Sequence, residues 1–352
     1  MRDLNRIGGP LFDGAPDDVL ALDIGGANIK AANGDGWVHS KPFALWKRRS
    51  KLVAALERIV AERRPRRVVA TMTGEIADCY DGRRDGVTDI VDAVCTAAEE
   101  FCPVGFYTVE GRLVTPAEAI ARPLAVAASN WHAVARLAAT LVTADRAVLI
   151  DVGSTTTDIV PLVGRAPAPA GHDDVTRMAV GELVYTGVER TPVAAIVRSL
   201  PWRGRLHPLA SELFAESRDV WLMLNGLDPL ATGGPTADGR PATREAAARR
   251  LARMLLADPA DVTESEAVAM AEWCADRQSR QVARAMARVA AATGGPPRCV
   301  VVSGHGACLA RRSLARVGWS ADVVSLADRL GAAVSRAAPA HGLALLARGL
   351  IA

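Results

Sequence analysis

Two segments of the chain share one pattern, and this internal repeat restricts the fold more than any other feature. The first, LALDIGGANIKAANGDG, begins at Leu20, and the second, AVLIDVGSTTTDIVPLV, begins at Ala147. Each is an apolar strand that ends in Asp, followed by a Gly turn and a second strand. The two strand-end residues, Asp23 and Asp151, are about 128 residues apart, so we expect two duplicated halves with similar folds.

The length of the chain permits two domains. Its 352 residues are 50% hydrophobic, which is enough for two cores of ordinary size. We expect an α/β protein in which each domain has a mixed sheet flanked by helices. The first domain is predicted to span residues 1–128, with a C-terminal helix at 334–352 that packs back onto it. The second is predicted to span 129–333, with a helical insertion at about 193–293 and a turn-rich loop at 232–247.

Periodicity predicts the elements of the first half. After a leader that contains Gly and Pro, residues 18–46 have the pattern of a three-stranded antiparallel meander. Helical spacing follows at 50–63, and the run RRVVATM after it is typical of a buried strand. Further helices are predicted at 86–101 and 127–143.

Composition excludes several classes of protein. The 42 Lys and Arg residues nearly balance 39 Asp and Glu residues, and the charge of +3 includes no block of like sign, which argues against a nucleic-acid binder. The six cysteines show no metal-ligand spacing and predict reduced thiols. The N-terminus lacks the apolar core of a signal peptide, and no stretch reaches the roughly 20 apolar residues that span a bilayer. We expect a cytoplasmic protein with no membrane partner, and a homodimer is possible.

The first Gly turn has the residues of an anion and metal site. Asp23 ends a buried strand and can position a hydrated Mg²⁺ ion. Gly25 and Gly26 have no Cβ, so their amides and Asn28 can approach phosphate oxygens, and Lys30 follows on the next strand. An Asp-Gly turn that only reverses the chain is the alternative.

The second turn repeats this layout with more polar groups. Asp151 again ends the strand, and the candidate phosphate-binding residues are Gly153, Ser154, Thr155 and Thr156. A Thr-rich strand start would not explain why both copies have the same layout. Asp158 is equally compatible with a site carboxylate and with a turn residue. Asp23 and Asp151 are therefore the candidate metal ligands and catalytic residues.

Two further turns follow predicted strands. Thr73, Gly74 and Glu75 can lie beside the site, although Thr73 is equally compatible with an N-cap that has Glu75 in the first helical turn. Gly304 and Gly306 open a helix, so their amides can face a phosphate, and His305 between them is a site residue or a local hydrogen-bonding partner.

Three polar residues are candidates for substrate binding. Asn130 opens the long predicted helix, and an N-cap of that helix is the alternative. Glu182 and Arg190 lie in a polar, Gly-rich segment just after the second turn, where a surface ion pair is the alternative.

Five elements in order, from the two Gly turns to the C-terminal Ala-rich helix, resemble the actin-like ATPase superfamily over nearly the whole chain. That resemblance implies two actin-like (ribonuclease H-like) domains. DVGSTTTDIVPL resembles the DxGGTSTD segment of the hydantoinase and oxoprolinase branch. TPAEAIARPLAVAASNWHAVA and GELVYTGVERTPV resemble proteins of the tetrahydromethanopterin-linked C1 transfer pathway, whose archaeal members are similar to the furan-methanamine synthases of methanofuran biosynthesis.

This resemblance implies a transferase. It would join an aminomethylfuran-methyl diphosphate to the phenol of a γ-glutamyltyramine or tyrosine-type acceptor and release diphosphate. Asp23 and Asp151 would position Mg²⁺, the two turns would hold the diphosphate, and Lys30 or Glu75 would assist. Because SGHGA lacks the Gly-rich adenosine turn of sugar kinases, the sequence favours a substrate that itself carries the diphosphate.

Two other functions remain open at this point. The same phosphate turns suit an ATP-dependent small-molecule kinase or a hydantoinase-like amidohydrolase. A regulator that senses a nucleotide without turnover is the non-enzymatic alternative.

Overall fold

A computed structural model describes residues 18–99, 102–229 and 236–351. The predicted leader and part of the loop at 232–247 lie outside these residues. Within them, contacts divide the chain into two units. The first comprises the chain up to Asp145, Leu162–Thr176 and the chain from Leu326, and the second comprises Arg146–Pro161 and Arg177–Ser325. Residues 129–145, which we had assigned to the second domain, therefore pack with the first unit.

The first unit contains a six-stranded mixed sheet with the order β3-β2-β1-β4-β5-β6. The strands are β1 (Val19–Ile24), β2 (Asn28–Ala32), β3 (Val38–Pro42), β4 (Arg67–Met72), β5 (Val104–Tyr107) and β6 (Leu113–Val114). β1, β2 and β3 form the predicted antiparallel meander, while β4 runs parallel to β1 and β5 parallel to β4.

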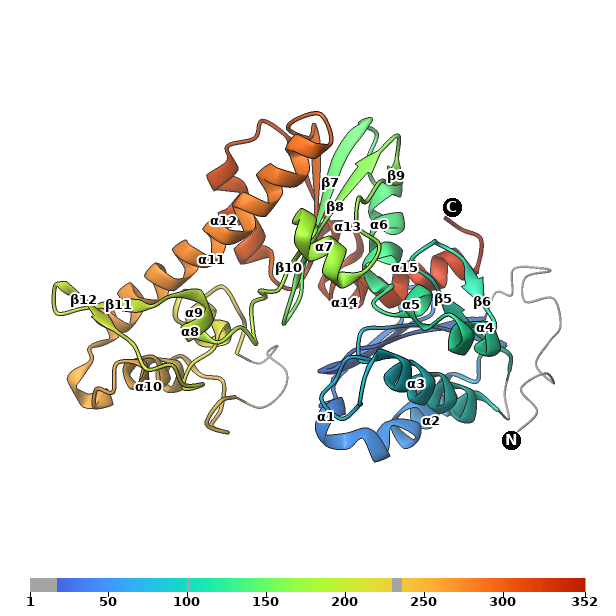
Figure 1. Cartoon of the computed structure of the whole chain (residues 1–352), viewed down its shortest axis with the longest axis horizontal. Helices are drawn as coiled ribbons and strands as arrows, with labels where there is room; N and C mark the ends of the chain where they lie inside the picture. Colours follow the sequence, from blue (N-terminus) through green and yellow to red (C-terminus); the bar gives the residue numbers. More distant parts are fainter. Residues whose placement is uncertain (1–17, 100–101, 230–235, 352) are drawn as a thin grey trace. The chain divides into compact units, whose positions relative to one another are not determined.

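The two faces of this sheet are covered by different helices, because side chains alternate along each strand. Leu20, Leu22 and Ile24 pack with α2 (Leu52–Arg63) and α3 (Arg83–Ala98). Val19 and Ala21 pack on the other face with α6 (Asn130–Thr140) and α15 (Ala338–Ala347). Figure 1 shows α15, in red, against the blue strands of this unit. The C-terminal helix thus packs against the first sheet.

Several helix boundaries in the first unit differ from the predicted ones: the helix predicted at 86–101 is α3 at Arg83–Ala98, and α2 begins two residues later than predicted. No helix follows Thr73, since the next helix, α3, begins at Arg83, so the N-cap alternative for Thr73 is wrong. The helix predicted from residue 127 begins at Asn130, because Ala128 has a φ of 48° that interrupts helical geometry. Asn130 is thus the first residue of α6, and Ser129 occupies the N-cap position.

The remaining helices of this unit are short. They are α1 (Leu45–Arg48), the 3₁₀ turn η2 (Arg49–Lys51), α4 (Pro116–Ala121), α5 (Pro123–Val126), α13 (Leu326–Leu330) and α14 (Ala332–Arg336). Thr115 and Glu118 form a capping box at the start of α4, and proline is the first residue of both α4 and α5. The paired strands β8 (Thr157–Val163) and β9 (Ala166–Pro167) precede helix α7 (Asp174–Val180), after which the chain continues into the second unit.

The second unit repeats the mixed-sheet arrangement with the order β10-β8-β7-β13-β14. Its strands are β7 (Arg146–Val152), β8 (Thr157–Val163), β10 (Leu183–Val184), β13 (Cys299–Gly304) and β14 (Asp322–Ser325), and β9 (Ala166–Pro167) pairs with β8. β13 runs parallel to β7, as β4 does to β1. The protein therefore has the predicted α/β fold with two mixed sheets flanked by helices.

A helical insertion separates β10 from β13. It consists of α8 (Val193–Ile196), the hairpin β11 (Ser199–Trp202) and β12 (Arg205–Pro208), α9 (Ser217–Met223), α10 (Arg244–Met254), the 3₁₀ turn η3 (Pro259–Asp261) and α11 (Glu264–Ala292). α12 (Ala307–Val317) follows β13 and packs on α11. One apolar core joins these helices to Val148, Ile150 and Val152 of β7. The predicted helix near Arg244 is confirmed.

Two observations concern the environment of the chain. The six cysteines are all free thiols. Among the residues that the structure describes, no helix combines the length and the apolar character of a membrane span.

Candidate active site

Asp23 and Lys30 form an ion pair at the end of the first sheet. They lie opposite each other in the β1–β2 register, with Lys30 Nζ 3.5 Å from Asp23 Oδ2. The Asp23 side chain is 4% exposed, and burial raises its pKa although Lys30 partly opposes this rise. Its Oδ1 atom is buried and accepts no hydrogen bond from the described residues. One oxygen of this carboxylate is therefore left for a ligand from outside the protein.

The first Gly turn packs directly against the turn that follows β4. The Gly25 amide donates to the Asn28 carbonyl at 3.0 Å, which closes the first turn. The Thr73 and Gly74 amides both donate to the carbonyl of Ile24 at 3.0 Å. The structure thus brings together the predicted residues of the two turns in this unit.

The glycines of these turns differ in how much room a Cβ atom would have. A Cβ on Gly74 would lie 2.7 Å from Leu45 Cδ2, and a Cβ on Gly25 would lie 3.1 Å from the Asn28 carbonyl oxygen. Close packing therefore accounts for Gly74 and favours glycine at 25. A Cβ on Gly26 would meet nothing within 4 Å, so this residue borders open space where a ligand can approach its backbone.

Glu75 directly follows Gly74 in the turn after β4 and is fully buried. Neither carboxylate oxygen has a hydrogen-bond partner among the described residues. Burial raises the pKa of Glu75 to about 7, and the nearby Arg83 and the backbone amides of Glu75 and Ala128 oppose this rise. Gly86 of α3 packs on its backbone, since a Cβ there would lie 2.1 Å from the Glu75 carbonyl oxygen. The predicted role of Glu75 in catalysis would require the site to reach a buried carboxyl group.

A buried polar chain connects β4 to the start of α6. Thr71, the register partner of Asp23 on β4, has its Oγ1 2.7 Å from Ser129 Oγ, which donates to the Tyr107 carbonyl at 3.0 Å. These contacts fix the start of α6, where the side chain of Asn130 accepts from the Trp131 amide at 2.8 Å. Asn130 is consequently held near the strand end that carries Asp23.

The second Gly turn closes in the same way as the first. The Gly153 amide donates to the Thr156 carbonyl at 2.9 Å, the counterpart of the Gly25–Asn28 bond. The turn is braced by the segment after β10, where the Glu189 and Arg190 amides donate to the Ser154 carbonyl at 3.0 and 2.9 Å. Arg190 therefore lies at the predicted phosphate turn.

Asp151 lies beside the turn that follows β13. It is the register partner of Ser303, and a Cβ on Gly304 would lie 2.9 Å from its Oδ1 atom. The same Cβ would lie 2.2 Å from the Val152 carbonyl oxygen, and Gly304 has a φ of 81°. The Gly306 amide donates to that carbonyl at 3.1 Å. Both glycines are thus required by close packing, and their role toward phosphate remains a prediction.

A buried carboxylate that the sequence did not reveal joins these two turns. Glu189 Oε1 lies 2.8 Å from His305 Nε2, and Oε2 accepts a hydrogen bond from Arg218 Nη2 at 3.0 Å. The side chains of Glu189 and Arg218 are only 4% and 3% exposed. The polar segment that contains Glu182 and Arg190 was the available signal, but nothing in it singled out Glu189.

The segment behind the second turn is fixed by a buried amide. Gln278 of α11 donates from Nε2 to the Gly187 carbonyl at 2.7 Å and accepts from Trp221 Nε1 at 2.9 Å. A Cβ on Gly187 would lie 2.5 Å from the Gly153 carbonyl oxygen. The position of the second turn therefore depends on α9 and α11 of the insertion.

Glu182 directly precedes the edge strand β10, and Asp158 lies on the neighbouring strand β8. Arg177 Nη1 donates to Asp158 Oδ1 at 2.8 Å, and its Nη2 donates to the Glu182 carbonyl at 3.0 Å. Asp158 is thus part of a buried ion pair, and Glu182 is itself buried.

The side chains of the site could bind Mg²⁺ only if substrate phosphates or water supplied further oxygen ligands. Across the described ranges, no three His, Cys, Asp or Glu side chains group closely enough to hold a metal. Mg²⁺ is commonly bound by one or two carboxylates together with substrate phosphates and water. The buried, unpartnered Oδ1 of Asp23 fits such a ligand.

Comparison with solved structures found sugar kinases of similar length. The chain has a TM-score of 0.48 and 15% identity to a ROK family glucokinase from Streptomyces griseus, over 95% of this chain and 99% of that one. For an inorganic polyphosphate/ATP-glucomannokinase from Arthrobacter sp. strain KM, the TM-score is 0.45 and the identity 14%, over 93% and 97% of the two chains.

Comparison of sequences gives the family. The hydantoinase/oxoprolinase model matches residues 66–344. A (4-{4-[2-(gamma-L-glutamylamino)ethyl]phenoxymethyl}furan-2-yl)methanamine synthase from Methanocaldococcus jannaschii is 33% identical over 331 residues, 93% of this chain and 97% of that protein. A synthase of the same name from Methanococcus vannielii is 26% identical over 201 residues, 56% of this chain and 89% of that protein. The chain therefore belongs to the hydantoinase/oxoprolinase family, in the group that includes these furan-methanamine synthases.

Proposed function

We propose that the protein condenses an aminomethylfuran-methyl diphosphate with the phenol of a γ-glutamyltyramine or tyrosine-type acceptor and releases diphosphate, as a step in the biosynthesis of a methanofuran-type C1 carrier. The observation that carries this proposal is the 33% identity to the Methanocaldococcus jannaschii synthase over nearly the full length of both chains.

The reaction breaks one bond to the leaving diphosphate and forms one bond to the phenol of the acceptor. The C–O bond between the furanylmethyl carbon and the diphosphate breaks, and its electron pair leaves with the diphosphate. The phenol oxygen forms the new bond to that carbon and loses its proton to the released diphosphate or to water. Because the furan ring stabilises the developing cation, the protein mainly has to accommodate the leaving diphosphate and orient the phenol.

The two Gly turns supply the residues for the diphosphate. The backbone amides around Gly26 and Ser154 would face its oxygens, and Lys30 would add positive charge. Asp23 and Asp151 would hold Mg²⁺, which when bound neutralises negative charge on the leaving oxygens. These assignments are supported by the unpartnered Oδ1 of Asp23 and by the matching hydrogen bonds that close the two turns.

The assay supplies the two substrates and Mg²⁺ and measures both diphosphate and the aryl ether product. We expect the two products in equal amounts, and loss of both in Asp151→Asn with retained folding. If no furanylmethyl diphosphate is consumed with any phenolic acceptor, the proposal is wrong. The family match to hydantoinases and oxoprolinases favours an amidohydrolase as the second candidate, and ATP-dependent opening of a cyclic amide would identify it.

A further inference from the structure

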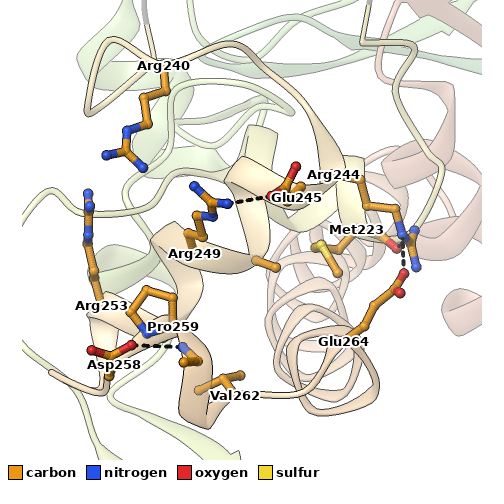
Figure 2. A pocket seen from close by; sticks show the side chains of 12 residues that line it. Met223, Arg240, Arg244, Glu245, Arg249, Arg253, Asp258, Pro259, Val262 and Glu264 are labelled. Atoms are coloured by element: carbon orange, nitrogen blue, oxygen red, sulfur yellow. Dashed lines mark hydrogen bonds and ion pairs between the residues drawn. The ribbon is translucent and has the colours of Figure 1, made fainter.

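A pocket of about 750 Å³ lies in the helical insertion of the second unit, away from the residues assigned to phosphate. Figure 2 shows the guanidinium groups of Arg240, Arg249 and Arg253 pointing toward the same space. Arg240 comes from the loop before α10, while Arg249 and Arg253 are four residues apart on α10 and share one face of that helix. We refer to this cavity as the arginine pocket.

Two arginines of the pocket, Arg240 and Arg253, share one carboxylate. The carboxylate of Asp238 lies 3.3 Å from Arg253, 3.9 Å from Arg240 and 2.9 Å from Arg250. One carboxylate thus faces three guanidinium groups, and Asp219 neutralises only Arg250, at 2.7 Å. This sharing leaves N–H groups of Arg240 and Arg253 available for an anionic group, because guanidinium N–H pairs bind carboxylates in a bidentate manner.

The ion pair of Arg249 is weak enough to be exchanged for a ligand. Arg249 Nη2 lies 2.5 Å from Glu245 one turn earlier on α10, and both side chains are exposed, at 46% and 77%. Exposed pairs of this spacing contribute little to stability. A bound carboxylate can therefore compete with Glu245 for this guanidinium.

The other residues of the pocket can contact the ammonium group and the carbon chain of an amino acid. The Asp258 carboxylate lines the same cavity, with Oδ1 accepting from the Ala260 amide at 2.9 Å, and Figure 2 shows it beside Arg253. Met223, Pro259 and Val262 add apolar contacts. Four guanidinium groups and three carboxylates line the pocket, and Glu264 and Glu245 pair with Arg244 and Arg249. Arg240, Arg253 and Asp258 are left to match an α-amino acid head, whose carboxylate is negative and whose ammonium is positive.

A short helix connects this pocket to the second Gly turn. Arg218, near the start of α9, binds Glu189, and the Glu189 amide binds the Ser154 carbonyl. Met223, the last residue of α9, lines the pocket. Five residues of helix correspond to about 8 Å along its axis.

We propose that the arginine pocket binds the α-amino acid head of the γ-glutamyl group on the phenolic acceptor. A γ-linked glutamate keeps its α-carboxylate and α-ammonium groups, so it presents the zwitterion that the pocket matches. The assignment rests on the proposed function, since the γ-L-glutamylamino group belongs to the product named for the relatives.

The test compares two acceptors that differ only in this head. Calorimetric titration of the whole chain with γ-glutamyltyramine and with tyramine should show at least about tenfold tighter binding of the first, the gain that one well-formed charged contact provides. Arg253→Gln and Arg249→Gln should each reduce that ratio at least about threefold and leave tyramine binding unchanged. Arg280→Gln is the matched control, because Arg280 is 54% exposed, pairs with Asp276 at 3.0 Å and lies outside the pocket.

Equal affinity for the two acceptors, or an unchanged ratio in both pocket variants, would overturn the proposal. Binding of inorganic phosphate that Arg253→Gln weakens, without binding of γ-glutamyltyramine, would assign the pocket to another anion and would also overturn it. The titration needs neither diphosphate nor turnover. A protein that prefers γ-glutamyltyramine yet consumes no furanylmethyl diphosphate would therefore refute the condensation reaction and leave the pocket assignment standing.

Discussion

Nε2 of His305 lies 2.8 Å from Oε1 of Glu189, and this contact joins the turn after β13 to the segment that braces the second Gly turn. The other carboxylate oxygen binds Arg218. Because the Glu189 amide also binds the Ser154 carbonyl, one residue connects three separate parts of the second unit. The geometry of the candidate phosphate turn therefore depends on Glu189.

We predict that Glu189→Ala lowers the free energy of unfolding by about 3 to 5 kcal/mol, because it leaves the guanidinium of Arg218 buried without its carboxylate. Glu189→Gln, which keeps the shape, should cost less. Urea denaturation measures both. Arg280→Ala, which removes an exposed ion pair, should change stability by less than about 1 kcal/mol. Wild-type stability in Glu189→Ala would contradict this account.

Gly187 offers a second way to displace the turn. A Cβ there would lie 2.5 Å from both the Gly153 carbonyl oxygen and the Ser154 carbonyl carbon, so Gly187→Ala should force the backbone apart. We expect a loss of about 1 to 3 kcal/mol in stability and weaker binding of diphosphate. In Gly82→Ala the new Cβ meets nothing within 4 Å, so both quantities should stay near wild type. Similar behaviour of the two variants would argue against close packing at Gly187.

Glu75 should make stability depend on pH. Its pKa is raised from 4.5 to about 7, so the folded state holds a proton that the unfolded state has released between these values. The contribution of Glu75 to stability is therefore full below about pH 4.5 and is lost as the pH rises to about 7, by up to about 3 kcal/mol. Glu75→Gln should remove this part of the pH dependence in thermal unfolding at pH 5, 6, 7 and 8. An equal slope in both proteins would show that another group titrates.

Asp23 should be needed for metal-dependent binding more than for folding. Burial disfavours the charged form of Asp23, and its partner Lys30 is partly exposed, so Asp23→Asn should cost little stability. The enhancement of diphosphate affinity by Mg²⁺ should fall at least about tenfold. Calorimetry with and without Mg²⁺ measures this. The control is Asp89→Asn, which removes a partly exposed carboxylate that pairs with Arg49 in the same unit. An undiminished Mg²⁺ effect in Asp23→Asn would exclude Asp23 as a ligand.

The main architecture follows from the sequence because periodicity and turn residues are local signals. Three elements lie where the sequence predicts them: the meander from Val19 to Pro42, the second Gly turn after Asp151 and the helix at Arg244. Helix starts were less predictable. Whether a helix begins at Ala127 or Asn130 depends on the φ of 48° at Ala128, which tertiary packing imposes and which no residue type there indicates.

Only part of the candidate site was predictable, because some of its residues meet through tertiary contacts that leave no local pattern in the sequence. Asp23, Gly25 and Gly74 lie close together because β1 and β4 are parallel neighbours, so their carboxyl ends meet at one edge of the sheet. The Asp-Gly and Thr-Gly patterns showed that each strand ends in a turn, but not that the two strands are neighbours. Glu189 and Arg218 meet through contacts between residues that are 29 positions apart. No spacing rule relates them, so their pairing needs the three-dimensional structure.

The most direct test of the central claim is calorimetric titration of the Mg²⁺-loaded protein with diphosphate and, separately, with ATP. We predict that diphosphate binds, that ATP binds at least about tenfold more weakly, and that Asp151→Asn weakens diphosphate binding by a similar factor. Tight binding of ATP together with no binding of diphosphate would contradict the proposed diphosphate-releasing synthase and would favour an ATP-dependent enzyme.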